Sequence, residues 1–244
     1  MTDEVLVLDG LGKDFGATVA LEAMTCQVRR GEIVGLLGPN GAGKTTTMKL
    51  VLGMLRPTRG SARFMGLDCT RDAHDVKRRL GYSPDEPVFY DFLNGKETIE
   101  FVLNVRGVPL APAWEALRPV IEGLELEDSL DVATGGYSHG TKKKLALVLA
   151  LAHDPALLLL DEPTNGLDPK TAARVRAILR QRADAGAAVV VSTHLLEMAD
   201  VLCDRVLVVH RGKLISEGTP DAVRAQAGVA SGASLEAAFL ALVR

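Results

Sequence analysis

The sequence has no excess of positive charge. Its 244 residues carry 28 Lys and Arg against 31 Asp and Glu, which gives a formal net charge of −3 at pH 7. A dedicated nucleic-acid-binding protein usually shows a strong basic excess, so we expect no nucleic-acid partner. Two local basic clusters, Lys77–Arg79 and Lys142–Lys144, are interpreted as solvated helix faces.

Cysteine is also scarce and follows no metal-binding spacing. Cys26, Cys69 and Cys203 are odd in number, far apart and set in apolar surroundings, with no CxxC pair. This usage is typical of reduced thiols in the core of a cytosolic protein.

Long apolar runs are absent. The longest, 145–152, is too short to cross a bilayer and ends in His153-Asp154-Pro155. The chain does not open on a basic segment followed by an apolar stretch, so we expect no signal peptide. We therefore expect a cytoplasmic protein that can meet a membrane from one side only.

What the sequence does contain is an alternation of apolar, strand-like segments with helical ones. This alternation predicts an α/β protein with a largely parallel sheet. The expected strands are 5–8, 32–37, 61–64, 157–160, 187–192 and 205–209. The expected helices of the α/β part are 44–53, 170–185 and 195–203. Between about 86 and 152 the pattern is helical throughout (97–106, 114–123 and 142–152), which predicts a helical insert, and a short amphipathic helix is expected at 234–243.

A glycine-rich segment connects the expected strand 32–37 to the expected helix 44–53. It fits the pattern GxxxxGK[ST] and consists of Gly38, Pro39, Asn40, Gly41, Ala42, Gly43, Lys44, Thr45 and Thr46. The glycines let backbone N–H groups surround a β-phosphate, and the helix N-terminus adds its positive dipole end. Lys44 can reach the β and γ oxygens, and the Thr45 hydroxyl can bind Mg²⁺. The segment predicts a site for Mg-ATP.

Two adjacent carboxylates, Asp161 and Glu162, follow the apolar strand 157–160. Buried strands rarely tolerate unpaired carboxylates, so acids at the carboxyl edge of a parallel sheet imply a polar ligand there. Asp161 is predicted to hold Mg²⁺ through water, and Glu162 to polarise the attacking water. A positioned base typically contributes about 10²–10⁴-fold to rate. The alternative is an acidic helix cap.

His194 follows another apolar strand, in Val191-Ser192-Thr193-His194. A lone histidine is usually a core or surface residue. This one falls just past the end of a strand, at the edge where the nucleotide is expected, and so can bind the γ-phosphate and orient water.

Together with further segments, these residues resemble the ABC-transporter ATPase family over essentially the whole chain. Tyr137-Ser138-His139-Gly140-Thr141 resembles the LSGGQ signature, and 161–169 resembles the Walker B and D-loop segment. Residues 192–194 resemble the H-loop, and Phe15 resembles the aromatic residue that stacks on adenine.

The resemblance implies one ABC ATPase domain over 1–244. Its fold would be a P-loop NTPase core with a mainly parallel sheet, an N-terminal antiparallel β subdomain and an inserted α-helical subdomain. The core would comprise 1–85 and 153–228, the helical signature subdomain 86–152 and the C-terminal helix 229–244.

The resemblance also implies a dimer that sandwiches two ATP molecules. Each nucleotide would lie between the Walker A loop of one subunit and the signature of a second ATPase subunit, either an identical chain or a close homologue. Nucleotide contacts would come from Ser138, Gly140 and Asp168 in addition to the phosphate loop. Integral-membrane permease subunits would hold the pair at the inner face of the cell membrane.

Two departures from the family pattern bear on function. His139 and Thr141 replace the first glycine and the glutamine of the signature, in a form that resembles bacterial exporters with a separate ATPase chain. Asp85 stands where the Q-loop glutamine is usual. Its carboxylate can ligate Mg²⁺, which prefers oxygen donors, but it adds negative charge near the γ-phosphate.

We therefore expect the ATP-hydrolysing subunit of an ABC transporter, specifically an exporter. One alternative is a soluble ABC ATPase acting on nucleic acid or ribosomes, which the acidic balance and the lack of a tandem unit or coiled coil disfavour. Another is a weakly hydrolysing regulatory module, which Asp85 and the altered signature favour but Glu162 and His194 oppose.

Overall fold

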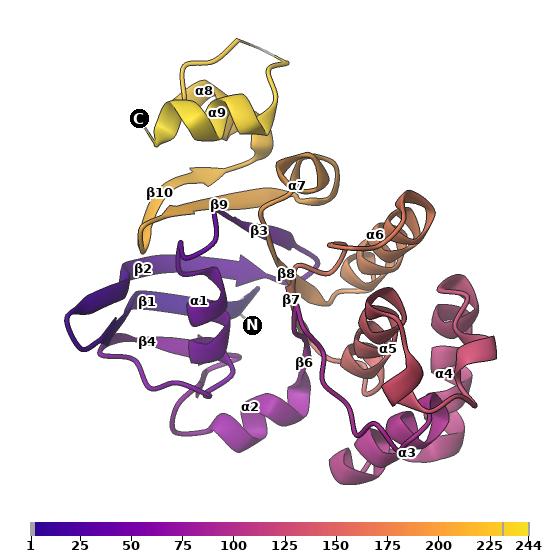
Figure 1. The fold of residues 1–244 in the computed structure, drawn as a ribbon. Coiled ribbons are helices and arrows are strands. Elements are labelled where there is room, and N and C mark those ends of the chain that lie inside the picture. Colours follow the sequence, from indigo (N-terminus) through magenta and orange to yellow (C-terminus); the bar gives the residue numbers. More distant parts are fainter. Residues whose placement is uncertain (1–2, 231, 244) are drawn as a thin grey trace.

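The computed structural model describes residues 3–230 and 232–243, which form two sheets flanked by helices (Figure 1). Four strands make an antiparallel sheet in the order β2-β1-β4-β5, and six make a mostly parallel sheet in the order β10-β9-β3-β8-β7-β6. The first sheet comprises β1 (Glu4–Phe15), β2 (Thr18–Arg29), β4 (Arg59–Phe64) and β5 (Leu67–Asp68). The second comprises β3 (Ile33–Leu37), β6 (Leu80–Ser83), β7 (Leu157–Asp161), β8 (Ala188–Thr193), β9 (Arg205–His210) and β10 (Lys213–Gly218).

The helices fall into three groups. Those that pack on the sheets are α1 (Lys44–Val51), α2 (Ala73–Arg79), α6 (Pro169–Asp184) and α7 (Leu196–Leu202). Those of the insert are α3 (Gly95–Arg106), α4 (Leu110–Gly123) and α5 (His139–Leu151), and those near the C-terminus are α8 (Pro220–Gln226) and α9 (Leu235–Leu242). Among the residues the structure describes, none of these helices has the length and apolar character needed to cross a membrane.

The predicted α/β fold with its parallel sheet and antiparallel N-terminal part is confirmed. Every expected strand is present, but β1 is much longer than 5–8, and β2, β5, β6 and β10 were not anticipated. In β1 the apolar pattern is interrupted by Gly10 and Gly12, and shifts in pairing register with β2 and β4 absorb the interruption. The first half of β2 is largely exposed and lacks a regular alternation, so it carries no clear strand signal.

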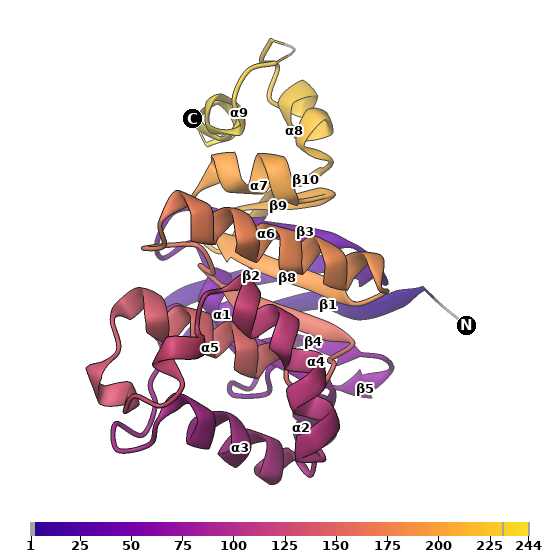
Figure 2. The ribbon, with the colours of Figure 1, turned by 90° about the vertical axis from the view of Figure 1, so that its right-hand side faces the viewer.

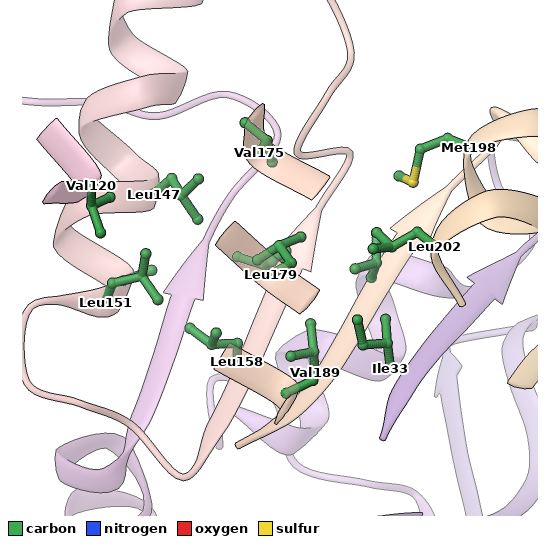
Figure 3. Close-up of a cluster of buried hydrophobic side chains, with 14 of the residues drawn as sticks. Ile33, Val120, Leu147, Leu151, Leu158, Val175, Leu179, Val189, Met198 and Leu202 are labelled. Atoms are coloured by element: carbon green, nitrogen blue, oxygen red, sulfur yellow. The ribbon is translucent and has the colours of Figure 1, made fainter. Parts of the chain in front are cut away.

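The central strands are buried on both faces, and successive residues serve two different cores. In β7, Leu157 and Leu159 pack with the antiparallel sheet and α1, whereas Leu158 and Leu160 pack against helices on the other face. Figure 3 shows this second core, where Leu158 and Val189 lie beside Leu179 of α6. A sheet covered on both faces explains why β7 and β8 are continuous apolar runs.

The two flanking groups of helices lie at opposite edges of the six-stranded sheet. Helices α3, α4 and α5 gather beyond β6, and α8 and α9 lie beyond β10 (Figure 1). The side view agrees, with α6 lying along the sheet between these groups (Figure 2). The basic cluster Lys77–Arg79 is exposed on α2, as interpreted from the sequence, and the three cysteines are buried free thiols, as expected.

His153 lies where the helical insert meets the parallel sheet. Its Nε2 is 3.0 Å from Nη1 of Arg106 in α3 and 3.2 Å from the carbonyl oxygen of Leu80 in β6. Burial, and then the charge of Arg106, lower the pKa of His153 from 6.5 to about 4. The junction therefore requires a neutral imidazole.

We predict that this histidine makes the stability depend on pH. Because its folded-state pKa lies below its unfolded value, the stabilisation is present above pH 6.5 and is lost as the pH falls towards 4. Urea unfolding between pH 7 and pH 4 should show His153→Gln losing about 1–3 kcal/mol less than the unmodified chain. His74, which is exposed, provides the control His74→Gln; identical slopes for both variants would contradict the assignment.

Candidate functional site

The polar residues singled out in the sequence converge at the carboxyl ends of β3, β6, β7 and β8. These strands run parallel, so the segments that follow them meet at one edge of the sheet. A cavity of about 680 Å³ lies there, within the range of small-molecule sites. It is lined by Ala20, Pro39, Asn40, Gly41, Gly43, Lys44, Thr45, Thr46, Lys49, Tyr82, Pro84, Asp85, Glu86, Asp161 and Glu162.

The glycine-rich segment bends around this cavity between β3 and α1. Gly41 and Gly43 have φ values of 80° and 111°, in the left-handed region that side chains disfavour. A Cβ on Gly43 would also come within 2.7 Å of the Ala20 carbonyl oxygen. The helix α1 begins at Lys44, so its free N–H groups and dipole face the same space, which fits a phosphate group.

Lys44 brings a buried positive charge to the cavity. Its ammonium donates to the carbonyl oxygens of Gly38 (2.7 Å) and Pro39 (3.3 Å), and it is only 6% exposed. Burial lowers its pKa, while Glu162, Asp161 and Asp85 act in the opposite direction. A cation held this way stabilises anionic oxygens strongly because little water screens it.

Asp161 ends β7 and is held by two hydroxyl groups. Thr45 Oγ1 donates to Asp161 Oδ2 (2.9 Å), and Ser192 donates to Asp161 Oδ1. A hydroxyl and a carboxylate are hard oxygen donors that suit Mg²⁺. Two such donors suit an ion that takes its other ligands from phosphate and water. Over 3–230 and 232–243 no cluster of three His, Cys, Asp or Glu that could hold a metal is present.

Glu162 is fixed in an unusual backbone conformation by its neighbours. Its φ is 47°, which for a residue with a side chain costs about 1–3 kcal/mol. Its N–H donates to the Ser192 carbonyl oxygen (3.0 Å), and its carboxylate accepts from Thr193 Oγ1 (3.1 Å) and the His194 N–H (3.0 Å). These bonds aim a buried carboxylate at the cavity.

His194 lies directly beside this carboxylate. Its Nδ1 is 2.9 Å from Glu162 Oε1, and Lys44 Nζ is 3.8 Å from the same oxygen. The His194 side chain is 42% exposed. The structure thus brings together the predicted base, the predicted orienting histidine and the phosphate-loop lysine.

Six predicted nucleotide contacts do not line the cavity: Gly38 and Ala42 within the phosphate loop, and four residues outside it. Ser138 and Asp168 are exposed N-caps of α5 and α6, accepting from the N–H groups of Thr141 (3.1 Å) and Thr171 (2.9 Å). The Thr171 hydroxyl also lowers the pKa of Asp168. Gly140 is in the first turn of α5, and Phe15 is 49% exposed on the β1–β2 hairpin. Their roles stay predictions.

The unusual His139 of the signature segment packs on the segment that follows Glu162. A Cβ on Gly166 would come within 3.2 Å of His139 Cδ2, and Gly166 itself has a φ of 75°. The imidazole therefore occupies the space that a side chain at 166 would need, which joins the signature to the D-loop of the same chain.

The structure corrects the interpretation of the basic cluster Lys142–Lys144. It also shows that Lys143 lies beside the site, which was not predicted from the sequence. The cluster Lys142–Lys144 was interpreted as a solvated helix face, but Lys143 is only 3% exposed. Its Nζ donates to Asp85 Oδ1 (2.8 Å) and to the Glu162 carbonyl oxygen (2.7 Å). The signal for burial was present, because Leu147 and Ala150 lie on the same face of α5 at helical spacing.

Comparison with known proteins places these segments in a defined family. The family model described as "ABC transporter" matches residues 21–165. The chain is 36% identical over 243 residues to the "Probable multidrug ABC transporter ATP-binding protein YbhF" of Escherichia coli (strain K12), which covers 99% of this chain. It spans only 42% of the length of that relative.

Two further likenesses extend over most of both molecules. The "Daunorubicin resistance ATP-binding protein DrrA3" of Streptomyces coeruleorubidus is 35% identical over 228 residues, which make up 93% of this chain and 72% of that protein. A solved structure described as "Structure of ATP binding subunit of ABC transporter" is 32% identical, with a TM-score of 0.93, and the match covers 98% of this chain and all of the other.

The geometry of the glycine-rich segment leads to a prediction about nucleotide binding. Gly43→Ala would place a Cβ against the Ala20 carbonyl oxygen and force a strained φ, so the phosphate cradle must move. We expect at least a tenfold loss of ATP affinity, roughly 1.4 kcal/mol, measured with a fluorescent ATP analogue. Gly123→Ala, where a Cβ meets no atom within 4 Å, is the control and should bind as before. Unchanged affinity in Gly43→Ala would exclude this cradle as the phosphate site.

Proposed function

The chain belongs to the ABC transporter family, as its motifs predict, and on this basis we propose that it binds and hydrolyses ATP to drive transport. One observation carries the proposal. Lys44, the pair Asp161-Glu162 and His194 come from three separate segments of the chain, yet their side chains meet. Lys44, Asp161 and Glu162 line one cavity that a helix N-terminus faces, and His194 Nδ1 lies 2.9 Å from Glu162 Oε1. A phosphate-binding loop next to a fixed carboxylate base is the arrangement that phosphoanhydride hydrolysis requires.

The chemistry follows from the positions of these groups. A water molecule attacks the γ-phosphorus in line with the bond to ADP, the new O–P bond forms, and the bridging P–O bond breaks. Glu162 accepts the proton of that water, while His194 holds the carboxylate and the water in orientation. Lys44 stabilises the charge on the γ-phosphate oxygens. Mg²⁺, which Thr45 and Asp161 would hold, supplies neutralising charge for the phosphates when bound.

The site would be completed by a second ATPase subunit. Ser138 caps α5 and is exposed, and neither Ser138 nor the first turn of that helix lines the cavity of its own chain. A helix N-terminus of this kind suits the γ-phosphate of a nucleotide bound to another copy. Dimerisation would therefore belong to the chemistry, with ATP as part of the interface.

The names of the relatives support transport, and export in particular, as the use of this ATPase. The insert carries exposed aromatic side chains close together: the Tyr90 ring lies 5.8 Å from the rings of Phe92 and Phe101. Phe92 is 78% exposed, which suits contact with a separate permease subunit. Membrane fractionation of producing cells tests this part; recovery outside the membrane fraction when the permease is present would contradict it.

We predict that Glu162→Gln separates binding from turnover. The amide keeps the size of the side chain but cannot accept a proton, so phosphate release should fall at least 100-fold, roughly 2.7 kcal/mol in barrier height. ATP affinity should stay within about threefold, and a stable dimer should form with ATP, seen by size-exclusion chromatography.

Glu197→Gln, in α7 outside the cavity, is the control and should hydrolyse ATP at the unmodified rate. Normal turnover in Glu162→Gln would refute the assignment of the base. A purified chain that binds ATP without any phosphate release would point instead to the regulatory alternative.

A further inference from the structure

The Lys143 ammonium joins three segments that are distant in the sequence. It projects from α5, which carries the signature at its start, and reaches the loop after β6 and the end of β7. Two hydrogen bonds are made at this point, 2.8 Å to Asp85 Oδ1 and 2.7 Å to the Glu162 carbonyl oxygen. With only 3% of the residue exposed, water cannot replace either bond.

The bond to the Glu162 carbonyl bears on the proposed base. Glu162 has a left-handed φ of 47°, and its carbonyl oxygen also accepts from the Asn165 N–H (3.2 Å). Asn165 belongs to the same turn, so Lys143 is the donor that holds this peptide group from a separate helix. Fixing the peptide group fixes the direction in which the Glu162 carboxylate leaves the backbone.

The bond to Asp85 explains why an acid stands at this position. A buried ammonium requires a partner of opposite charge, which an aspartate supplies and a glutamine does not. Asp85 lines the nucleotide cavity, yet its Oδ1 is engaged by Lys143 and not by Thr45 or Asp161, which bind each other. The carboxylate thus balances a charge inside the protein.

We propose that Lys143 is a positioning residue for ATP hydrolysis, with Asp85 as its counter-charge. Lys143 sets the orientation of Glu162 and ties the loop of Asp85 to the base, so that signature helix, loop and base move as one unit. The inference rests on the proposed hydrolysis and deepens it. It assigns Asp85, whose side chain is 41% exposed, to an ion pair with the buried Lys143 in place of the Mg²⁺ contact expected from the sequence.

The test combines substitutions of both partners. Lys143→Met removes the charge and both bonds while keeping the length of the side chain, and we expect kcat to fall at least tenfold with KM within twofold. ATP affinity measured in EDTA should also stay within twofold, because Lys143 touches no part of the phosphate cradle. Asp85→Asn should lower kcat at least threefold.

The double variant Asp85→Asn/Lys143→Met distinguishes an ion pair from two independent roles. If Asp85 acts through Lys143, the double variant should be no slower than Lys143→Met, within twofold. Losses that multiply, together with a raised Mg²⁺ concentration for half-maximal ATP binding in Asp85→Asn, would make Asp85 a metal ligand and overturn the proposal.

Two further variants serve as controls for misfolding and for loss of a specific contact. Lys144→Met, the neighbouring and less buried lysine, is the control and should keep the unmodified kcat. Lys143→Arg retains a cation and hydrogen-bond donors and should keep a higher kcat than Lys143→Met. Equal losses of kcat in the two variants would overturn the positioning role.

Thermal melting is recorded for each variant to check that it folds. Should Lys143→Met not fold, Asp85→Asn and Lys143→Arg carry the test. If the unmodified chain released no phosphate, the proposed function itself would fail; normal turnover in Lys143→Met would defeat this inference alone.

Discussion

Two adjacent carboxylates at the end of a buried strand constrain the whole active region. Asp161 and Glu162 are almost fully buried, and charges in such a place must be paired or neutralised. The surroundings supply what they need. Hydroxyls come from Thr45, Ser192 and Thr193, and the backbone N–H and the side chain of His194 follow the end of β8. Because these donors come from neighbouring parallel strands, the sheet order β3-β8-β7-β6 is a condition for the chemistry.

The sequence predicted the parts of this region that are contiguous along the chain. The segment 38–46, the pair Asp161-Glu162 and His194 each follow an apolar strand, and parallel strands bring their ends together. The arrangement of the fold could also be predicted, since apolar runs of strand length alternate with helical periods. Strand β2 could not, because its first half is exposed and its pattern depends on the sheet it joins.

Contacts between segments far apart in the chain could not be predicted from the sequence. Three consecutive lysines resemble a solvated surface. The helical spacing of Lys143 to Leu147 and Ala150 indicates a buried face, but only the packing of α5 against β6 shows what encloses this lysine. Its partner Asp85 is 58 residues away, so the departure from the usual glutamine had no visible cause. In the same way, the position of His139, within 3.2 Å of where a Cβ on Gly166 would lie, gives the altered signature a structural role that its letters do not indicate.

The groups that are proposed to bind and hydrolyse the nucleotide lie in a different part of the chain from the helix caps that are predicted to contact a second nucleotide. The phosphate loop and the base line the cavity and His194 lies beside the base, while the caps at Ser138 and Asp168 are exposed and lie outside the cavity. We propose that hydrolysis needs two chains. The most direct measurement is the rate of phosphate release per chain as a function of protein concentration, with the oligomeric state followed by sedimentation in the same samples. If two chains are needed, the rate per chain should rise with concentration and level off once dimers with ATP predominate. A constant rate per chain under conditions where sedimentation finds only monomers would contradict it.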